Sequence, residues 1–71
     1  MNLNVTKVKQ TLDALRISKN DFSIKFGIHR SYLYNVLNGT VVAGRKFFAA
    51  WAKFCNLFEL NFIDYFDFDD N

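Results

Sequence analysis

The 71-residue chain has no proline, only three glycines, one cysteine and one histidine. A lone cysteine, Cys55, excludes an internal disulfide and offers no cluster of metal ligands, which is typical of a reducing, cytoplasmic setting. No Ser-His-Asp or Cys-His arrangement for nucleophilic catalysis is evident, because the chain has one histidine and no elbow-type glycine pattern. The composition therefore predicts a protein that is not an enzyme and that uses no metal or other cofactor.

Long apolar runs are also missing from the sequence. No window approaches the ~20 apolar residues of a membrane span, and the N-terminal stretch "MNLNVTKVKQ" lacks the apolar segment of a signal peptide. We therefore expect a cytoplasmic protein without a membrane partner. Half of the residues (51%) are hydrophobic and 18% are aromatic, which favours a packed globule over a disordered chain. With no repeat, linker or low-complexity stretch, residues 1–71 are expected to form one domain.

Charge is divided unevenly along the chain. Residues 1–53 carry all nine Lys and Arg against only Asp13 and Asp21, whereas residues 54–71 carry five acidic side chains and no basic one. A basic body favours a surface that faces a polyanion, although ordinary solvated surface charge explains such a division equally well. The acidic end, about residues 67–71, lacks the spacing of a calcium loop and is expected to be a solvated tail.

Apolar spacing and capping residues predict an all-α fold that begins with two helices. Val5, Val8, Leu12 and Leu15 recur at helical spacing and predict a first helix that ends near Arg16. Ser18 stands three residues before Asp21, which is typical of an N-cap that opens a second helix. Gly27 can adopt the left-handed conformation that ends this helix.

A third helix is predicted from Arg30 to about Leu37, ending at Asn38-Gly39 with Gly39 left-handed. At about 100° per residue, its side chains divide into two arcs. The polar arc contains Arg30, Ser31, Tyr34 and Asn35. The opposite arc contains Tyr32, Leu33, Val36 and Leu37.

Two further helices complete the predicted five-helix fold. Residues 45–55 form the fourth helix, with its core side chains at Phe47, Phe48, Trp51, Phe54 and Cys55. A short fifth helix is expected around Glu59 to Phe66. The stretch "FDFD" that begins at Phe66 also alternates as the end of a strand does.

The stretch "ISKNDFSIKFGIHRSYLYNVLNGT", residues 17–40, resembles the helix-turn-helix of the lambda-repressor-like (Cro/C1, or XRE) DNA-binding domains. The matching positions are the cap Ile17-Ser18, the apolar Phe22 and small Ser23, the turn Phe26-Gly27-Ile28, the apolar Leu33 and Val36, and the terminal Asn38-Gly39. The frame extends over about residues 5–66. One departure is the loop at residues 40–44, which is apolar where members of the family often carry polar or basic residues.

The resemblance implies a compact domain whose third helix lies in the DNA major groove. The residues it places against base edges are Arg30, Ser31, Tyr34 and Asn35, with arginine suited to guanine and asparagine to adenine. The residues it places at phosphates are Ser18, Lys19, His29, Asn38, Thr40 and Arg45. A solvated surface is the alternative for this face, and a turn or capping role is the first expectation for His29.

Members of the family usually act as dimers on half-sites about 34 Å apart, so the resemblance implies a homodimer on a two-fold symmetric operator. The residues assigned to the dimer interface are Phe58, Leu60, Phe62, Tyr65 and Phe66; alternatively they cover the first and fourth helices. The implied function is sequence-specific binding of double-stranded DNA by a transcriptional regulator. We expect a repressor of phage or mobile-element type that acts by occupying its operator, without a small-molecule ligand.

A different class of function is compatible with the same fold. The chain could be a protein-interaction module of inhibitor, antitoxin or anti-defence type. It would then bind a protein partner through the loop Val41-Val42 and the aromatic C-terminal end. The salt dependence of binding separates the two hypotheses, because phosphate contacts weaken steeply with salt and apolar contacts do not.

Overall fold

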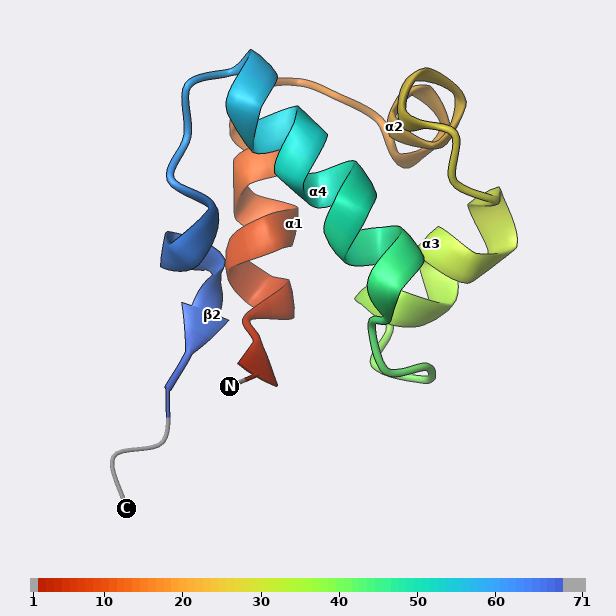
Figure 1. Cartoon of the computed structure of the whole chain (residues 1–71). Helices are drawn as coiled ribbons and strands as arrows, with labels where there is room; N and C mark the ends of the chain where they lie inside the picture. Colours follow the sequence, from red (N-terminus) through yellow and green to blue (C-terminus); the bar gives the residue numbers. More distant parts are fainter. Residues whose placement is uncertain (1, 69–71) are drawn as a thin grey trace.

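The computed structural model describes residues 2–68 and shows a mostly helical fold (Figure 1). Its α-helices are α1 (Val5–Ala14), α2 (Lys19–Phe26), α3 (Arg30–Leu37) and α4 (Arg45–Leu57). A 3-10 turn, η1 (Phe62–Tyr65), precedes the short strand β2 (Phe66–Asp67), which pairs with β1 (Asn2–Leu3). In Figure 1, α4 crosses the middle of the molecule, with α2 and α3 on its right and the η1–β2 segment on its left.

Local chemistry sets the ends of the first two helices. The side chain of Asn4 accepts a 3.0 Å hydrogen bond from the Lys7 amide and begins α1, and Arg16, at φ 57°, turns the chain away after its end. The Ser18 hydroxyl accepts a 3.0 Å hydrogen bond from the Asp21 amide and begins α2. Gly27 ends α2 in the left-handed conformation at φ 68°. Both predicted ends of the second helix are confirmed.

The third and fourth helices also lie close to their predicted positions. The bounds of α3, Arg30–Leu37, are those expected, and Gly39 is left-handed at φ 80°. The fourth helix begins at Arg45 as predicted but continues to Leu57.

The short fifth helix expected around Glu59 to Phe66 is present only as the 3-10 turn η1 and not as an α-helix. Glu59 is left-handed at φ 57°, and the Leu60 amide donates to the Cys55 carbonyl, so the chain reverses direction as α4 ends. Only Phe62–Tyr65 then form a 3-10 turn, and Phe66 pairs with Leu3 in an antiparallel ladder. The fold is mostly helical and compatible with the expected all-α class, with one pair of two-residue strands that joins the two ends of the described chain.

The core is a cluster of aromatic rings around Trp51, which is fully buried. Its indole stacks on Phe54 at a centroid distance of 4.6 Å and on Phe47 at 6.1 Å, while Phe22 of α2 lies 5.8 Å away. These contacts join α2 to α4. Cys55 belongs to the same core, as expected, and burial raises the pKa of its thiol to about 11.

Two of the residues assigned to a dimer interface are core residues of the single chain. Tyr65 and Phe66 are each 6% exposed. The Tyr65 hydroxyl accepts a 3.0 Å hydrogen bond from Thr11 of α1, and its ring meets Trp51 of α4 edge-on. This burial argues against a place for them in a dimer interface and agrees with the alternative that they cover α1 and α4.

The other members of that predicted interface keep more surface. Phe58 is 36% exposed, and Leu60 and Phe62 are half-buried against the core. Of the predicted acidic tail, Asp67 and Phe68 are exposed, and residues 69–71 lie outside the described residues.

Candidate nucleic-acid interface

A tight turn joins α2 to α3 and fixes how the two helices pack. Residues 27–29 separate them, and the Ile28 amide donates a 3.0 Å hydrogen bond to the Ser23 carbonyl. The side chain of Ile28 is buried under the turn, at 6% exposure. The left-handed Gly27 and the buried Ile28 therefore hold α3 against α2 in one orientation.

The two predicted arcs of α3 face in opposite directions. Leu33, Val36 and Leu37 are each 1% exposed and hold the helix to the core. Arg30, Ser31 and Tyr34 are exposed and Asn35 is half-buried. The structure thus brings the four candidate base-reading residues onto one outward surface of one helix, whose hydrogen-bonding groups face away from the core.

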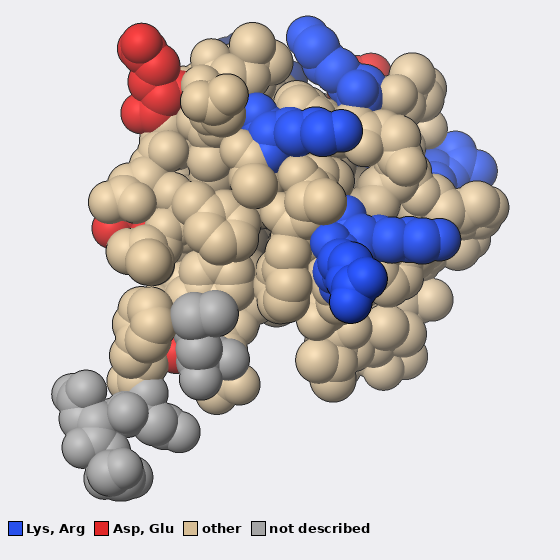
Figure 2. All heavy atoms as spheres, in the orientation of Figure 1, with Lys and Arg blue, Asp and Glu red and all other residues tan. Residues whose placement is uncertain are grey.

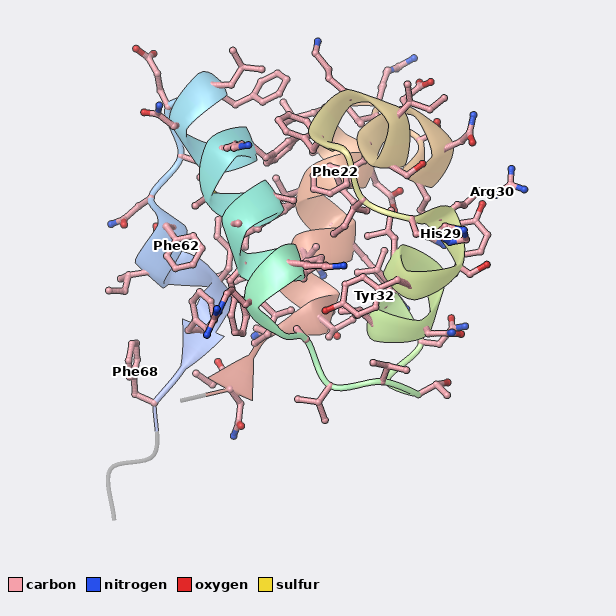
Figure 3. All side chains as sticks on the ribbon, turned by 45° about the vertical axis from the view of Figure 1, so that its right-hand side comes forward. Phe22, His29, Arg30, Tyr32, Phe62 and Phe68 are labelled. Carbon is pink, nitrogen blue, oxygen red and sulfur yellow. The ribbon has the colours of Figure 1, made fainter. Side chains whose placement is uncertain are left out.

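His29 begins α3 as its N-cap. Its Nδ1 accepts a 3.2 Å hydrogen bond from the Ser31 amide, which confirms the predicted capping role. An acceptor at Nδ1 assigns the ring proton of the neutral imidazole to Nε2. In Figure 3, His29 and Arg30 lie together at the outer edge of the molecule.

Two cations lie where the start of α2 meets the outward surface of α3. The Lys19 ammonium lies 5.4 Å from the centroid of the Tyr34 ring. The Arg30 guanidinium donates a 3.4 Å hydrogen bond to the side-chain oxygen of Asn20. Both contacts are made to uncharged groups, so neither contact neutralises the positive charge that the surface presents.

The loop between α3 and α4 is attached firmly to α3. The amides of Thr40 and Val41 both donate to the Asn35 carbonyl, at 2.9 and 3.1 Å. At the other end of the loop, the Tyr32 hydroxyl accepts a 2.9 Å hydrogen bond from the Gly44 amide. In Figure 3 the Tyr32 ring lies between α3 and the start of α4. The loop therefore has a defined position relative to the outward surface of α3.

A shallow groove lies at the junction of α3 and α4, and its lining includes His29, Tyr32, Arg45 and Lys46. Of these, His29 and Arg45 were predicted phosphate contacts, whereas Tyr32 and Lys46 were missed. Two adjacent basic residues, Arg45 and Lys46, are a sequence feature that could have indicated Lys46. Their position beside Tyr32 depends on where α4 begins. Asn38 and Thr40, two more predicted phosphate contacts, are exposed at the end of α3, and Ser18 is exposed at the start of α2.

Charge separates across the surface as it does along the chain. All nine Lys and Arg are exposed. Figure 2 shows Lys and Arg side chains over the upper and right-hand part of this face and most of the visible acidic side chains at its left. Glu59, Asp64 and Asp67 belong to that C-terminal side. The outward surface of α3 thus lies on the positive side of the molecule.

Comparison with known proteins adds no relative. No family model, curated protein or solved structure matches the chain. None of the helices within residues 2–68 is long and apolar enough to cross a membrane.

Proposed function

We propose that this chain is a sequence-specific, double-stranded DNA-binding transcriptional regulator of the lambda-repressor-like type. In this proposal α2 and α3 are the helix-turn-helix, and α3 enters the major groove. The observation that carries the proposal is the outward arc of α3. It combines one arginine, one asparagine, one serine and one tyrosine on a helix anchored by three buried residues.

Each side chain of this arc has a base-edge chemistry. Arg30 can donate two hydrogen bonds to a guanine, and Asn35 can donate and accept at an adenine, each pair discriminating by about 1–3 kcal/mol. Ser31 can bond a base edge, and the ring of Tyr34 can pack on a thymine methyl group. The contact of Lys19 with Tyr34 restrains that ring. The proposed reading surface therefore suits a short mixed sequence.

Phosphate contacts would surround the reading surface. Lys19 lies on one side of α3, and Arg45 and Lys46 lie beside the groove on the other. The Ser18 hydroxyl accepts from the Asp21 amide and still has its own proton to donate. His29 has its Nε2–H, and Asn38 and Thr40 have exposed polar groups. These contacts would position α3 without reading sequence.

We propose that the chain acts by occupying an operator and blocking access to it, as expected for a repressor of a phage or mobile element. One helix-turn-helix reads few base pairs, so a two-fold symmetric operator bound by two copies is the expected target.

Selection of duplexes from random DNA on the purified protein, at two salt concentrations, tests the proposed function. The expected result is one enriched sequence with two inverted half-sites and affinity that falls steeply with salt. The variant with Arg30→Ala and Asn35→Ala should lose preference for that sequence but keep its fold. The matched control carries Lys7→Ala and Asn56→Ala. Lys7 bonds the Asp64 carbonyl beside η1, and Asn56 lies near the C-terminal end of α4, so neither residue belongs to the outward surface of α3. Sequence-blind binding, or equal loss in the control, would refute the assignment of α3.

The second candidate function has one observation in its favour. Val42 is 91% exposed and Val41 37%, in a loop fixed to α3 by backbone hydrogen bonds. An ordered apolar projection suits a protein contact. If no duplex is enriched, capture of a protein whose binding is insensitive to salt and lost on Val42→Asp would favour the protein-interaction module.

A further inference from the structure

The exposed loop after α3 faces a hollow that continues to the N-terminal strand. This surface is here called the loop patch. It is lined by the apolar side chains of Leu3, Val5, Val36, Val41, Val42 and Ala43, together with Asn2 and Gly39. Val42 projects from it, while Val36 at its base is buried. The patch therefore combines an apolar projection and an apolar hollow on one surface.

Charge distinguishes the loop patch from the other exposed apolar surfaces of residues 2–68. A hollow near Ile24 and Phe58 is bordered by Arg16, Asp21 and Lys25. The surface with Ile63 and Phe68 carries the acidic side chains Glu59, Asp64 and Asp67 on the same C-terminal segment. Within residues 2–68, none of the residues that line the loop patch is charged, and the nearest acidic residue along the sheet is Asp67, which pairs with Asn2 at the edge of the patch.

This difference matters for contacts between two copies of one chain. In a two-fold symmetric dimer the same patch occurs on both sides, so a patch dominated by one sign of charge meets that sign again. Like charges across an interface cost several kcal/mol. The acidic C-terminal surface has this disadvantage, and the loop patch does not. In Figure 2 the lower right of the molecule is free of coloured Lys, Arg, Asp and Glu atoms.

We propose that the loop patch is the contact surface for a second copy of this chain, with Val42 of each copy seated in the hollow of the other. A two-fold contact requires one surface to be complementary to itself, and a projection beside a hollow meets that requirement. The contact differs from the C-terminal aromatic interface expected from the sequence, whose members Tyr65 and Phe66 are buried within one chain.

The same contact would fix the spacing of two DNA-reading helices. The loop is hydrogen-bonded to the carbonyl of Asn35, so a contact through Val42 sets the position of α3 in one copy relative to the other. This consequence depends on the proposed DNA binding. Self-association through Val42 does not depend on it and is measured without DNA.

Sedimentation equilibrium over a range of protein concentrations, without DNA, tests the proposal on the full chain. Wild type is expected to approach twice the monomer mass as concentration rises. Val42→Asp and Val42→Lys should both weaken self-association at least tenfold, because either charge would have to enter an uncharged hollow. Leu57→Asp, at a leucine of α4 that is 56% exposed, is the matched control and should associate as wild type does.

Three results would overturn the proposal. The first is a wild type that stays monomeric up to about millimolar concentration, where even a weak contact near −4 kcal/mol forms. The second is a dimer that tolerates either charge at position 42. The third is an equal loss of self-association in the Leu57→Asp control. Circular dichroism of each variant checks the fold, and the use of two opposite charges keeps one misfolded variant from deciding the outcome. A dimer that fails to enrich any duplex would contradict the proposed DNA binding and leave this contact intact.

Discussion

The hydroxyl oxygen of Tyr32 accepts a 2.9 Å hydrogen bond from the backbone amide of Gly44, twelve residues further along the chain. Tyr32 belongs to α3, and Gly44 is the N-cap of α4 and has no side chain of its own to cap the helix. The tyrosine therefore joins the proposed reading helix to the start of the helix that carries Arg45 and Lys46. Its phenol links the proposed base-reading residues of α3 to the proposed phosphate contacts at the start of α4.

Tyr32→Phe should destabilise the fold by about 0.5–1.5 kcal/mol, because the Gly44 amide loses its acceptor. Urea unfolding measures this loss. Tyr34→Phe, which changes an exposed ring in the same helix, is the matched control and should be nearly neutral. Because no charge is removed, the salt dependence of DNA binding should keep its slope in both variants. Equal stability of the two variants would show that the Tyr32 contact contributes nothing.

Gly27→Ala should cost about 1–2 kcal/mol, because φ at this position is 68° and a Cβ is strained there. No atom lies within 4 Å of the added Cβ, so steric contact adds nothing to the strain. Thermal unfolding of Gly27→Ala and Gly27→Asn checks the reason, since asparagine tolerates the left-handed region better. A larger loss of stability for Gly27→Asn than for Gly27→Ala would contradict backbone strain as the cause.

His29→Ala should destabilise α3 by about 0.5–2 kcal/mol through loss of its N-cap, whereas His29→Ser should keep most of the stability. The serine variant also separates the two proposed roles of the residue. If His29 also binds a phosphate, His29→Ser should retain stability but bind the selected duplex more weakly. Unfolding and DNA titration of the same preparations measure both effects, and full affinity in the serine variant would exclude the phosphate contact.

Cys55 should make the fold lose stability in alkali. Burial raises the pKa of its thiol from 9.0 to about 11, so above pH 9 the unfolded chain releases a proton that the native chain keeps. The stabilising contribution is complete below pH 9 and is lost as pH rises towards 11. Urea unfolding at pH 7.5 and pH 10 measures the free energy of unfolding at each pH. This free energy should decrease more for wild type than for Cys55→Ala, in which other groups still titrate. The same decrease in both would refute this account.

The helical part of the fold could be predicted because its signals are local. Ser18, Gly27 and Gly39 each determine a helix end through their own side chain or backbone conformation, within a few residues of that end. The division of α3 into a buried and an exposed arc follows from the helical period alone. These two features placed the candidate base-reading residues on one outward surface.

The C-terminal part could not be predicted in the same way. Phe62 and Phe66 are spaced as on a helix, but the backbone of Phe66 pairs with Leu3, a partner at the other end of the chain. Lys46 and the Tyr32–Gly44 hydrogen bond were missed for a related reason. Both depend on where α4 lies against α3, which only the packing of the aromatic core determines.

The most direct test of the central claim is a titration of isotope-labelled protein with the selected duplex, observed by backbone amide NMR. The largest shifts are expected at Arg30–Asn35, at the turn 27–29 and around Arg45 and Lys46, while Ile63 and Phe68 should change little. Shifts concentrated at residues 57–68, or none at α3 under conditions of saturated binding, would contradict the claim that the outward surface of α3 reads DNA.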